Sequence, residues 1–178
     1  MRDAEASVRG PGLVVIGLPA GAEQAATVDR FRARGYAVVA FEPDAACDVD
    51  AALAALALHV EGLRTQLPAG GRVAVAGYGR AGVLAFLAVT RLGVDGAAVF
   101  RGSGIGAYLA ESKFARVPMS MHFDDADANV PLVEVRKIKG ALEGIGIIEI
   151  YRYERWDDAA AAHAEQRACE VLDGLRAV

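Results

Sequence analysis

The stretch Arg72–Val89, RVAVAGYGRAGVLAFLAV, predicts the central unit of the fold. Its first residues, Arg72–Ala76, are rich in Val and Ala and are typical of a buried β-strand, whereas the apolar residues from Val83 onward indicate a helix. Between them lies Gly77–Gly82, in which three glycines and an alanine have little or no side chain. Small residues at such a junction allow a strand to turn tightly into a helix that packs against it.

The same alternation of strand and helix continues on both sides of this unit. We expect further strands at 13–17, 36–41, 96–100, 119–123 and 147–151, and helices at about 22–34, 48–67, 83–92, 131–142 and 158–176. The strands are short and nearly continuous in apolar residues, which is typical of a parallel sheet covered by helices on both faces. No linker or repeat interrupts the pattern, so residues 1–178 are expected to form one α/β domain, with residues 1–10 flexible.

The composition excludes several classes of protein. Of the 178 residues, 54% are hydrophobic and 24% are charged, as in a folded globular chain. The net charge is −4 and no basic block occurs, so we expect no nucleic-acid and no membrane partner. No apolar run is long enough to span a membrane and no signal sequence is recognised, which predicts a cytoplasmic location. Cys47 and Cys169 fit no metal-ligand spacing and are expected to be buried, and we predict no cofactor and no metal.

Ligands of parallel α/β sheets bind outside the carboxyl ends of the strands, so the residues that follow each strand are candidates for a binding site. The binding candidates are Leu18, Tyr78, Arg80, Arg101 and Ser103. Arg80 and Arg101 together could hold a carboxylate or a phosphate, which favours an anionic small molecule as the ligand. The alternative is that each arginine pairs with a neighbouring carboxylate.

Other polar side chains have simpler interpretations. Asp124, Asp125 and Asp127 follow the strand at 119–123, but their spacing fits no calcium loop and favours turn capping. His122 lies inside that strand and is expected in the core. His163 lies well inside the last helix, too far along it to serve readily as a catalytic base.

The turn at 77–82 has two interpretations. Gly77, Gly79 and Gly82 form the G-x-G-x-x-G pattern of dinucleotide-binding folds, although two strand–helix units precede it and Arg101 ends the next strand, where an acidic residue is expected. The second interpretation is an elbow of the kind that presents a nucleophile in hydrolases, with Gly79 at its tip. Glycine has no nucleophilic atom, so such an elbow would lack its attacking group.

Between Gly12 and about Tyr153 the sequence resembles the dienelactone hydrolase family of α/β-hydrolases. The segments that carry the resemblance are GYAVVAFEPD at 35–44, the stretch at 72–89, VDGAAVFRGSGIG at 94–106 and VPMSMHFDDADANVP at 117–131. The family reads G-x-C-x-G-G at its elbow. The resemblance implies a three-layer α/β-hydrolase core with a mostly parallel sheet of about six or seven strands.

The resemblance also implies where a Cys–His–Asp triad would fall. The acid falls on Asp127, the nucleophile on Gly79, and the histidine in the turn after the last strand, close to Trp156. Covalent acyl transfer needs a nucleophile and a base, so we expect an inactive or weak hydrolase relative that binds a small molecule or acts as a scaffold, and that could form a homo-oligomer. The alternatives are an active ester or lactone hydrolase with a relocated nucleophile, and a dinucleotide-binding protein.

Overall fold

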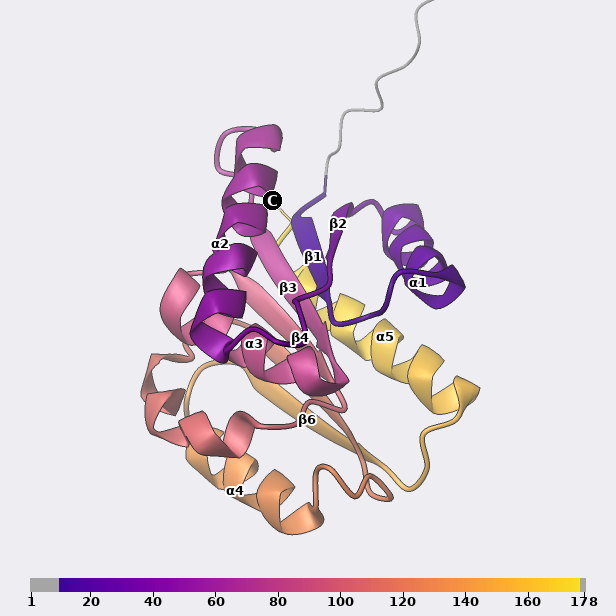
Figure 1. Cartoon of the computed structure of the whole chain (residues 1–178), viewed down its shortest axis with the longest axis vertical. Helices are drawn as coiled ribbons and strands as arrows, with labels where there is room; N and C mark the ends of the chain where they lie inside the picture. Colours follow the sequence, from indigo (N-terminus) through magenta and orange to yellow (C-terminus); the bar gives the residue numbers. More distant parts are fainter. Residues whose placement is uncertain (1–9, 177–178) are drawn as a thin grey trace, which may run out of the picture.

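The computed structural model describes residues 10–176, and the segment predicted to be flexible, 1–10, lies outside them except for Gly10. Six strands form one sheet in the order β2-β1-β3-β4-β5-β6, and every neighbouring pair is parallel (Figure 1). The prediction of a mostly parallel sheet of about six or seven strands is confirmed. The strands are β1 (Gly12–Ile16), β2 (Ala37–Phe41), β3 (Val73–Tyr78), β4 (Gly96–Phe100), β5 (Met119–Asp124) and β6 (Ile148–Tyr153).

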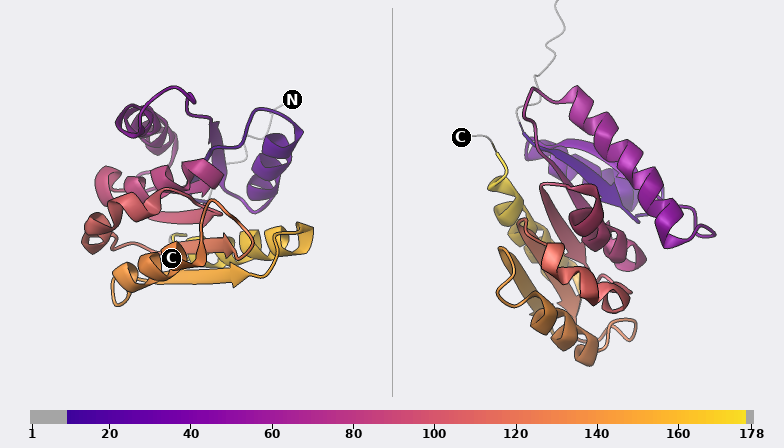
Figure 2. Two further views of the ribbon diagram at one scale, coloured as in Figure 1. Left: turned by 60° about the horizontal axis from the view of Figure 1, so that its bottom comes forward. Right: turned by 90° about the vertical axis from the view of Figure 1, so that its left-hand side faces the viewer.

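Helices cover both faces of this sheet (Figure 2), as the continuous apolar strands predict. The successive side chains of β1 point to opposite faces: Leu13 and Val15 join one buried cluster, and Val14 and Ile16 join the other. The first cluster includes side chains of α1 (Ala22–Ala33) and α5 (Asp158–Asp173), and the second includes those of α2 (Val49–Gln66), α3 (Gly82–Leu87) and α4 (Leu132–Leu142).

Two helices begin at aspartate caps near the carboxyl edge of the sheet. The side chain of Asp48 accepts a hydrogen bond of 2.8 Å from the backbone N–H of Ala51, which confirms the predicted start of α2. Asp157 accepts one of 2.9 Å from the N–H of Ala160 at the start of α5. Each cap satisfies an amide that has no partner within the helix, and so holds the helix end in place.

Three details differ from the predictions. A 3₁₀ segment, η3 (Ile105–Phe114), lies between β4 and β5, where the sequence predicts no element, because such segments lack an amphipathic repeat that would reveal them. The helix after β3 starts with a 3₁₀ turn, η1 (Gly79–Ala81), and ends in a π-helical segment, η2 (Ala88–Leu92), so it is not one regular helix. Cys169 is buried as expected, but Cys47 is exposed because it lies in the loop before α2.

In the part of the chain that the structure describes, no helix has both the length and the apolar character needed to cross a membrane.

Candidate functional site

The junction between β3 and α3 is built by the close approach of small residues. A Cβ atom at Gly77 would lie 2.6 Å from the carbonyl oxygen of Ala81, and one at Gly82 would lie 2.3 Å from the Cα of Gly102. Any larger residue would therefore collide with backbone atoms, which cannot move without disturbing the sheet. Packing thus explains the first and last glycines of the G-x-G-x-x-G pattern without a bound dinucleotide.

Gly79 is the first residue after β3 and has the left-handed backbone conformation of a sharp turn, with φ of 53°. Unlike its neighbours, it faces open space, because no atom lies within 4 Å of the position that its Cβ would take. Its carbonyl oxygen accepts a hydrogen bond of 3.2 Å from the N–H of Ser103, which joins the turn to the loop after β4. The backbone therefore has the form of an elbow, and the tip of the elbow carries no side chain.

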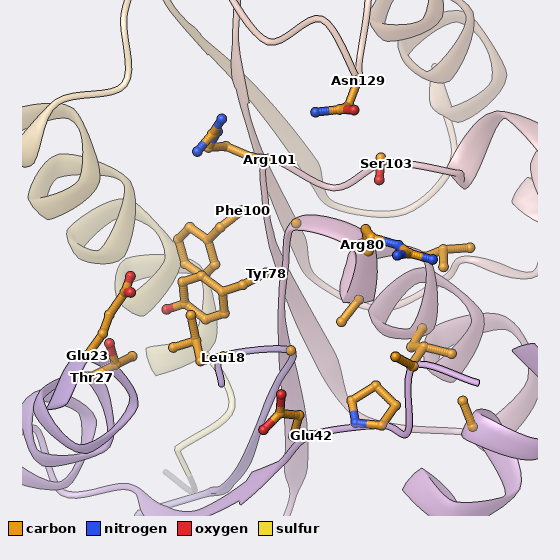
Figure 3. A pocket seen from close by; sticks show the side chains of 18 of the residues that line it. Leu18, Glu23, Thr27, Glu42, Tyr78, Arg80, Phe100, Arg101, Ser103 and Asn129 are labelled. Atoms are coloured by element: carbon orange, nitrogen blue, oxygen red, sulfur yellow. The ribbon is translucent and has the colours of Figure 1, made fainter. Parts of the chain in front are cut away.

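The turn lies in a cleft of about 660 Å³ at the carboxyl ends of the strands (Figure 3). The chain brings the predicted site residues to this cleft from the ends of β1, β3, β4, β5 and β6. All eight of them line it: Leu18, Tyr78, Gly79, Arg80, Arg101, Ser103, Asp127 and Trp156.

One wall of the cleft is aromatic. The ring of Tyr78 stacks on that of Phe100 with 4.5 Å between centroids, and the stack continues across the sheet to His122 at 5.2 Å and Tyr151 at 5.0 Å. The hydroxyl of Tyr78 is buried and has no hydrogen-bond partner among the described residues, and burial raises its pKa well above the ordinary value. The opposite wall is aliphatic and is formed by side chains of α2 and α3, namely Val49, Ala52, Val83 and Leu84.

Asp127 is held by Arg101 rather than by a histidine. An oxygen of its carboxylate lies 3.2 Å from Nη2 of Arg101, and the Asp127 side chain is only 6% exposed. The carboxylate also accepts hydrogen bonds from the backbone N–H and the side-chain amide of Asn129, at 2.9 and 3.0 Å. The guanidinium carbon of Arg101 lies 5.9 Å from the centre of the Trp156 ring. Arg101 thus occupies the space between the predicted acid position and Trp156.

Arg101 has an unusual backbone. Its φ of 53° is the one positive value found at a non-glycine residue in the described chain. An L-residue reaches this region at a cost, so the surrounding structure must hold it there. Its Nε is buried without a hydrogen-bond partner among the described residues, at 3.8 Å from the carboxylate of Asp124.

Arg80 differs from Arg101 in that no hydrogen bond or ion pair holds it within residues 10–176. It is exposed, and Figure 3 shows its guanidinium directed away from that of Arg101. The two arginines line the same cleft but do not form the fork that would grip one carboxylate or phosphate. The alternative, pairing with a neighbouring carboxylate, is what Arg101 adopts.

The other two aspartates after β5 have structural partners. Asp124 accepts a hydrogen bond of 2.9 Å from the N–H of Ala126, and Asp125 binds the guanidinium of Arg152 through both oxygens at 2.8 and 2.6 Å. No group of three His, Cys, Asp or Glu side chains suited to a metal ion occurs among the described residues. The loop therefore serves as a capped turn, in agreement with the sequence interpretation.

The histidines of β5 and α5 lie outside the lining of the cleft. His122 is fully buried, as expected, and its Nδ1 lies 3.1 Å from the hydroxyl of Tyr153, which lies 3.2 Å from Nδ1 of His163. Burial, reinforced by the charges of His163 and Arg167, lowers the pKa of His122 to about 3. His122 is therefore neutral at physiological pH but only weakly basic, and it lies outside the lining of the cleft, so it is poorly suited to take a proton from a group there.

Sequence reasoning missed the side chains that the helices contribute to the cleft, including those of α1 and α5. Thr27 and Arg30 of α1 and Glu165 of α5 line it, and Arg30 binds both oxygens of Glu165 at 2.7 Å. Glu23 of α1 and the loop of Cys47 complete that rim. Among these further lining residues, only Glu42, Pro43 and Asp44 could be expected, because they directly follow strand β2. The helical residues could not, because the side of a helix that faces the cleft depends on packing that local sequence does not specify.

The fold and the position of the cleft are those of an α/β-hydrolase. The model of the dienelactone hydrolase family matches residues 41–170, and the chain belongs to this family. Among solved structures, a Klebsiella pneumoniae protein provisionally described as a dienelactone hydrolase has 16% identity and a TM-score of 0.76, over 92% of this chain and 88% of that one.

Two esterases have the same fold. An esterase from Thermogutta terrifontis, phosphoramylated by tabun, has 15% identity and a TM-score of 0.75, over 97% of this chain and 86% of its own. An esterase from Pyrococcus furiosus has 14% identity and a TM-score of 0.76, over 95% of this chain and 82% of its own. Among curated proteins, no sequence matches this chain.

Proposed function

We propose that this member of the dienelactone hydrolase family binds a small molecule in its cleft and does not hydrolyse it through the covalent route of the family. The observation that carries the proposal is Gly79. It occupies the tip of the elbow with a positive φ and open space above it, and it has no atom that can attack a carbonyl carbon. Without a nucleophile no acyl intermediate can form.

The surroundings of Gly79 support the same conclusion. No histidine lines the cleft within the described residues, and Trp156 occupies the region where the resemblance places the catalytic base. Asp127, at the acid position, is engaged by Arg101 at 3.2 Å. Of the catalytic devices of the family, the oxyanion donors are expected to remain, such as the backbone N–H of Arg80, and donors without a nucleophile give weak rate enhancement.

The size and chemistry of the cleft favour binding over a purely structural role. Its volume of about 660 Å³ lies within the usual range for small-molecule sites. Tyr78 and Trp156 form part of its walls without filling it, and Arg101, Ser103 and Asp127 place polar groups beside them. Apolar walls with a few convergent polar groups are typical of a ligand site.

Hydrolysis of short aryl esters and a dienelactone tests the catalytic half of the proposal. We expect only weak turnover, close to the blank, for the wild-type protein, and the same rate for Asp127→Asn. Gly79→Cys supplies a thiol without a base, and Gly79→Cys with Trp156→His supplies both. We expect measurable burst acylation only in these two variants. Wild-type turnover that Asp127→Asn abolishes would overturn the proposal, and Cys47→Ala and Ser103→Ala would then locate the nucleophile, since both side chains line the cleft.

A further inference from the structure

We propose that the cleft selects a cationic aromatic small molecule, such as an arylalkyl amine, over an anion. This inference rests on the proposed binding role and adds the chemical class of the ligand. It also replaces the anionic ligand that two neighbouring arginines suggested from the sequence. The reasons are the charge balance of the cleft, the distribution of its carboxylates and the nature of its walls.

The cleft is lined by more carboxylates than guanidinium groups. Six acidic side chains and three arginines contribute to its lining. Two of the arginines are already paired with acids of the cleft: Arg30 with Glu165, at 2.7 Å, and Arg101 with Asp127, at 3.2 Å. Four carboxylates then remain against Arg80 alone. A cleft lined by one sign of charge concentrates ligands of the opposite sign, so an anion would meet net repulsion here.

The remaining carboxylates are spread along the rim instead of meeting at a point. Glu23 comes from the first turn of α1, Glu42 follows β2, and Asp44 and Asp48 lie in the loop before α2. Figure 3 shows Glu23 and Glu42 on either side of Leu18. Since no three of the described acids, histidines or cysteines converge as metal ligands would, the arrangement fits an extended organic cation and not a divalent metal ion.

The aromatic wall supplies a second, independent reason. Tyr78 and Trp156 are both partly exposed and line the cleft. The faces of such rings attract cations, and the guanidinium of Arg101 already lies 5.9 Å from the Trp156 ring centre. Flat rings therefore find an apolar surface, and an attached ammonium group finds carboxylates around it.

Three probes that share one ring system and differ in charge test this inference: naphthylmethylamine, naphthylmethanol and naphthoate. Binding to the full chain is followed by titration calorimetry and by ligand-observed NMR. We expect the amine to bind about tenfold more tightly than the carboxylate, which corresponds to about 1.4 kcal/mol, with the alcohol between them. The preference for the amine should shrink as salt is added, because the rim carboxylates are exposed and screened.

Two variants identify the groups responsible. Glu23→Gln with Glu42→Gln removes two of the four unpaired carboxylates and should clearly reduce the advantage of the amine over the alcohol. Glu42→Gln retains an oxygen acceptor for the N–H of Ala20, which Glu42 binds at 3.1 Å. Glu143→Gln removes an exposed carboxylate that lies outside this cleft and is the matched control. It should leave all three affinities unchanged.

The outcomes separate the inference from the proposed function. Tightest binding of naphthoate, or an amine preference that is undiminished in the Glu23→Gln and Glu42→Gln double variant, would overturn the inference and leave the binding role intact. Binding of none of the three probes would overturn the binding role itself. Hydrolytic turnover by the wild-type protein that Asp127→Asn abolishes would overturn only the non-catalytic half of the proposed function.

Discussion

The turn after β3 and the loops after β5 and β6 lie at the same edge of the sheet, but different forces build them. In the turn, Gly77 and Gly82 allow backbone to approach backbone so closely that a single Cβ would lie 2.6 Å or less from main-chain atoms. In the loops, side chains hold the structure: Arg101 pairs with Asp127, and the Trp156 ring lies 5.3 Å from that of Tyr153.

This difference separates the backbone form of the elbow from the side chains that surround it. The backbone of the turn is determined by packing that does not involve the residue at its tip, since Gly79 faces open space. The loops are held instead by an ion pair between Arg101 and Asp127 and by the contact between the rings of Tyr153 and Trp156. A fold therefore does not specify a reaction, which depends on a few side chains placed on it.

The turn should be the region least tolerant of substitution. Gly82→Val places a Cβ 2.3 Å from the Cα of Gly102, where only backbone movement gives relief, and it should lower the free energy of unfolding by about 3 kcal/mol or more. Gly140 lies on the exposed face of α4, and a Cβ there meets no atom within 4 Å. Gly140→Ala should therefore raise the free energy of unfolding by about 0.5–1 kcal/mol. Urea unfolding measures both, and equal midpoints would contradict the packing account.

β5, the strand that leads into the first of these loops, should carry the strongest dependence of stability on pH. Burial lowers the pKa of His122 to about 3 in the folded state, whereas an unfolded histidine titrates near about 6.5. Between these values the unfolded chain binds more protons, so stability is complete above about pH 6.5 and falls as pH decreases toward about 3. The loss between about pH 7 and about pH 5 should approach 2 kcal/mol.

Urea unfolding at both pH values checks this effect, with two variants beside the wild type. His122→Phe retains a flat ring between Phe100 and Tyr151 and should remove most of the pH dependence. His59→Gln, on α2 at the opposite face of the sheet, should leave it unchanged. A His122→Phe protein that loses as much stability in acid as the wild type would show that other groups control the acid response.

The fold could be predicted from the sequence because its signals are local. Short apolar strands alternate with helical stretches, and the cap at Asp48 marks the start of α2. The candidate residues at strand ends all reached the cleft, because parallel strands place their carboxyl ends at one edge. The segment η3 was missed because its residues carry no helical repeat.

The electrostatics of the site could not be predicted in the same way. Arg101 points toward Asp127 because its backbone has a positive φ, which composition does not reveal. Glu165 reaches the cleft from α5, 135 residues beyond its partner Arg30 on α1, so their pairing depends on how the two helices pack. The predicted anionic ligand rested on Arg80 and Arg101 together, and the sequence did not show that Arg101 is paired with Asp127.

The ion pair between Arg101 and Asp127 can be measured by a double-mutant cycle. Arg101→Met should lower the free energy of unfolding by about 1–2 kcal/mol, because Asp127 is only 6% exposed and loses its opposite charge. Asp127→Asn removes that charge and retains an amide oxygen for the bonds from Asn129, so the double variant should recover most of the loss. Additive effects of the two substitutions on the free energy of unfolding would show that the two side chains have no net interaction energy.

The smallest effect is expected at Asp157, whose carboxylate caps α5 beside the cleft. The hydrogen bond from Ala160, followed by the charge and hydrogen bond of Arg155, lowers the pKa of Asp157 below its ordinary value, so its stabilising contribution is present at neutral pH and is lost as the pH falls through that lowered value. Asp157→Ala should leave the N–H of Ala160 unsatisfied, yet α5 stays packed on the sheet through Ala164, Ala168 and Leu172.

The loss should therefore stay within the first turn of α5. Hydrogen exchange should accelerate at the amides near Ala160, while amides in the middle of the helix remain protected and the unfolding midpoint falls less than in Arg101→Met. Asp157→Asn keeps a capping oxygen and should exchange almost as slowly as the wild type. Faster exchange along the whole helix would mean that the cap, and not the buried alanine face, fixes α5 and with it the position of Glu165 in the cleft.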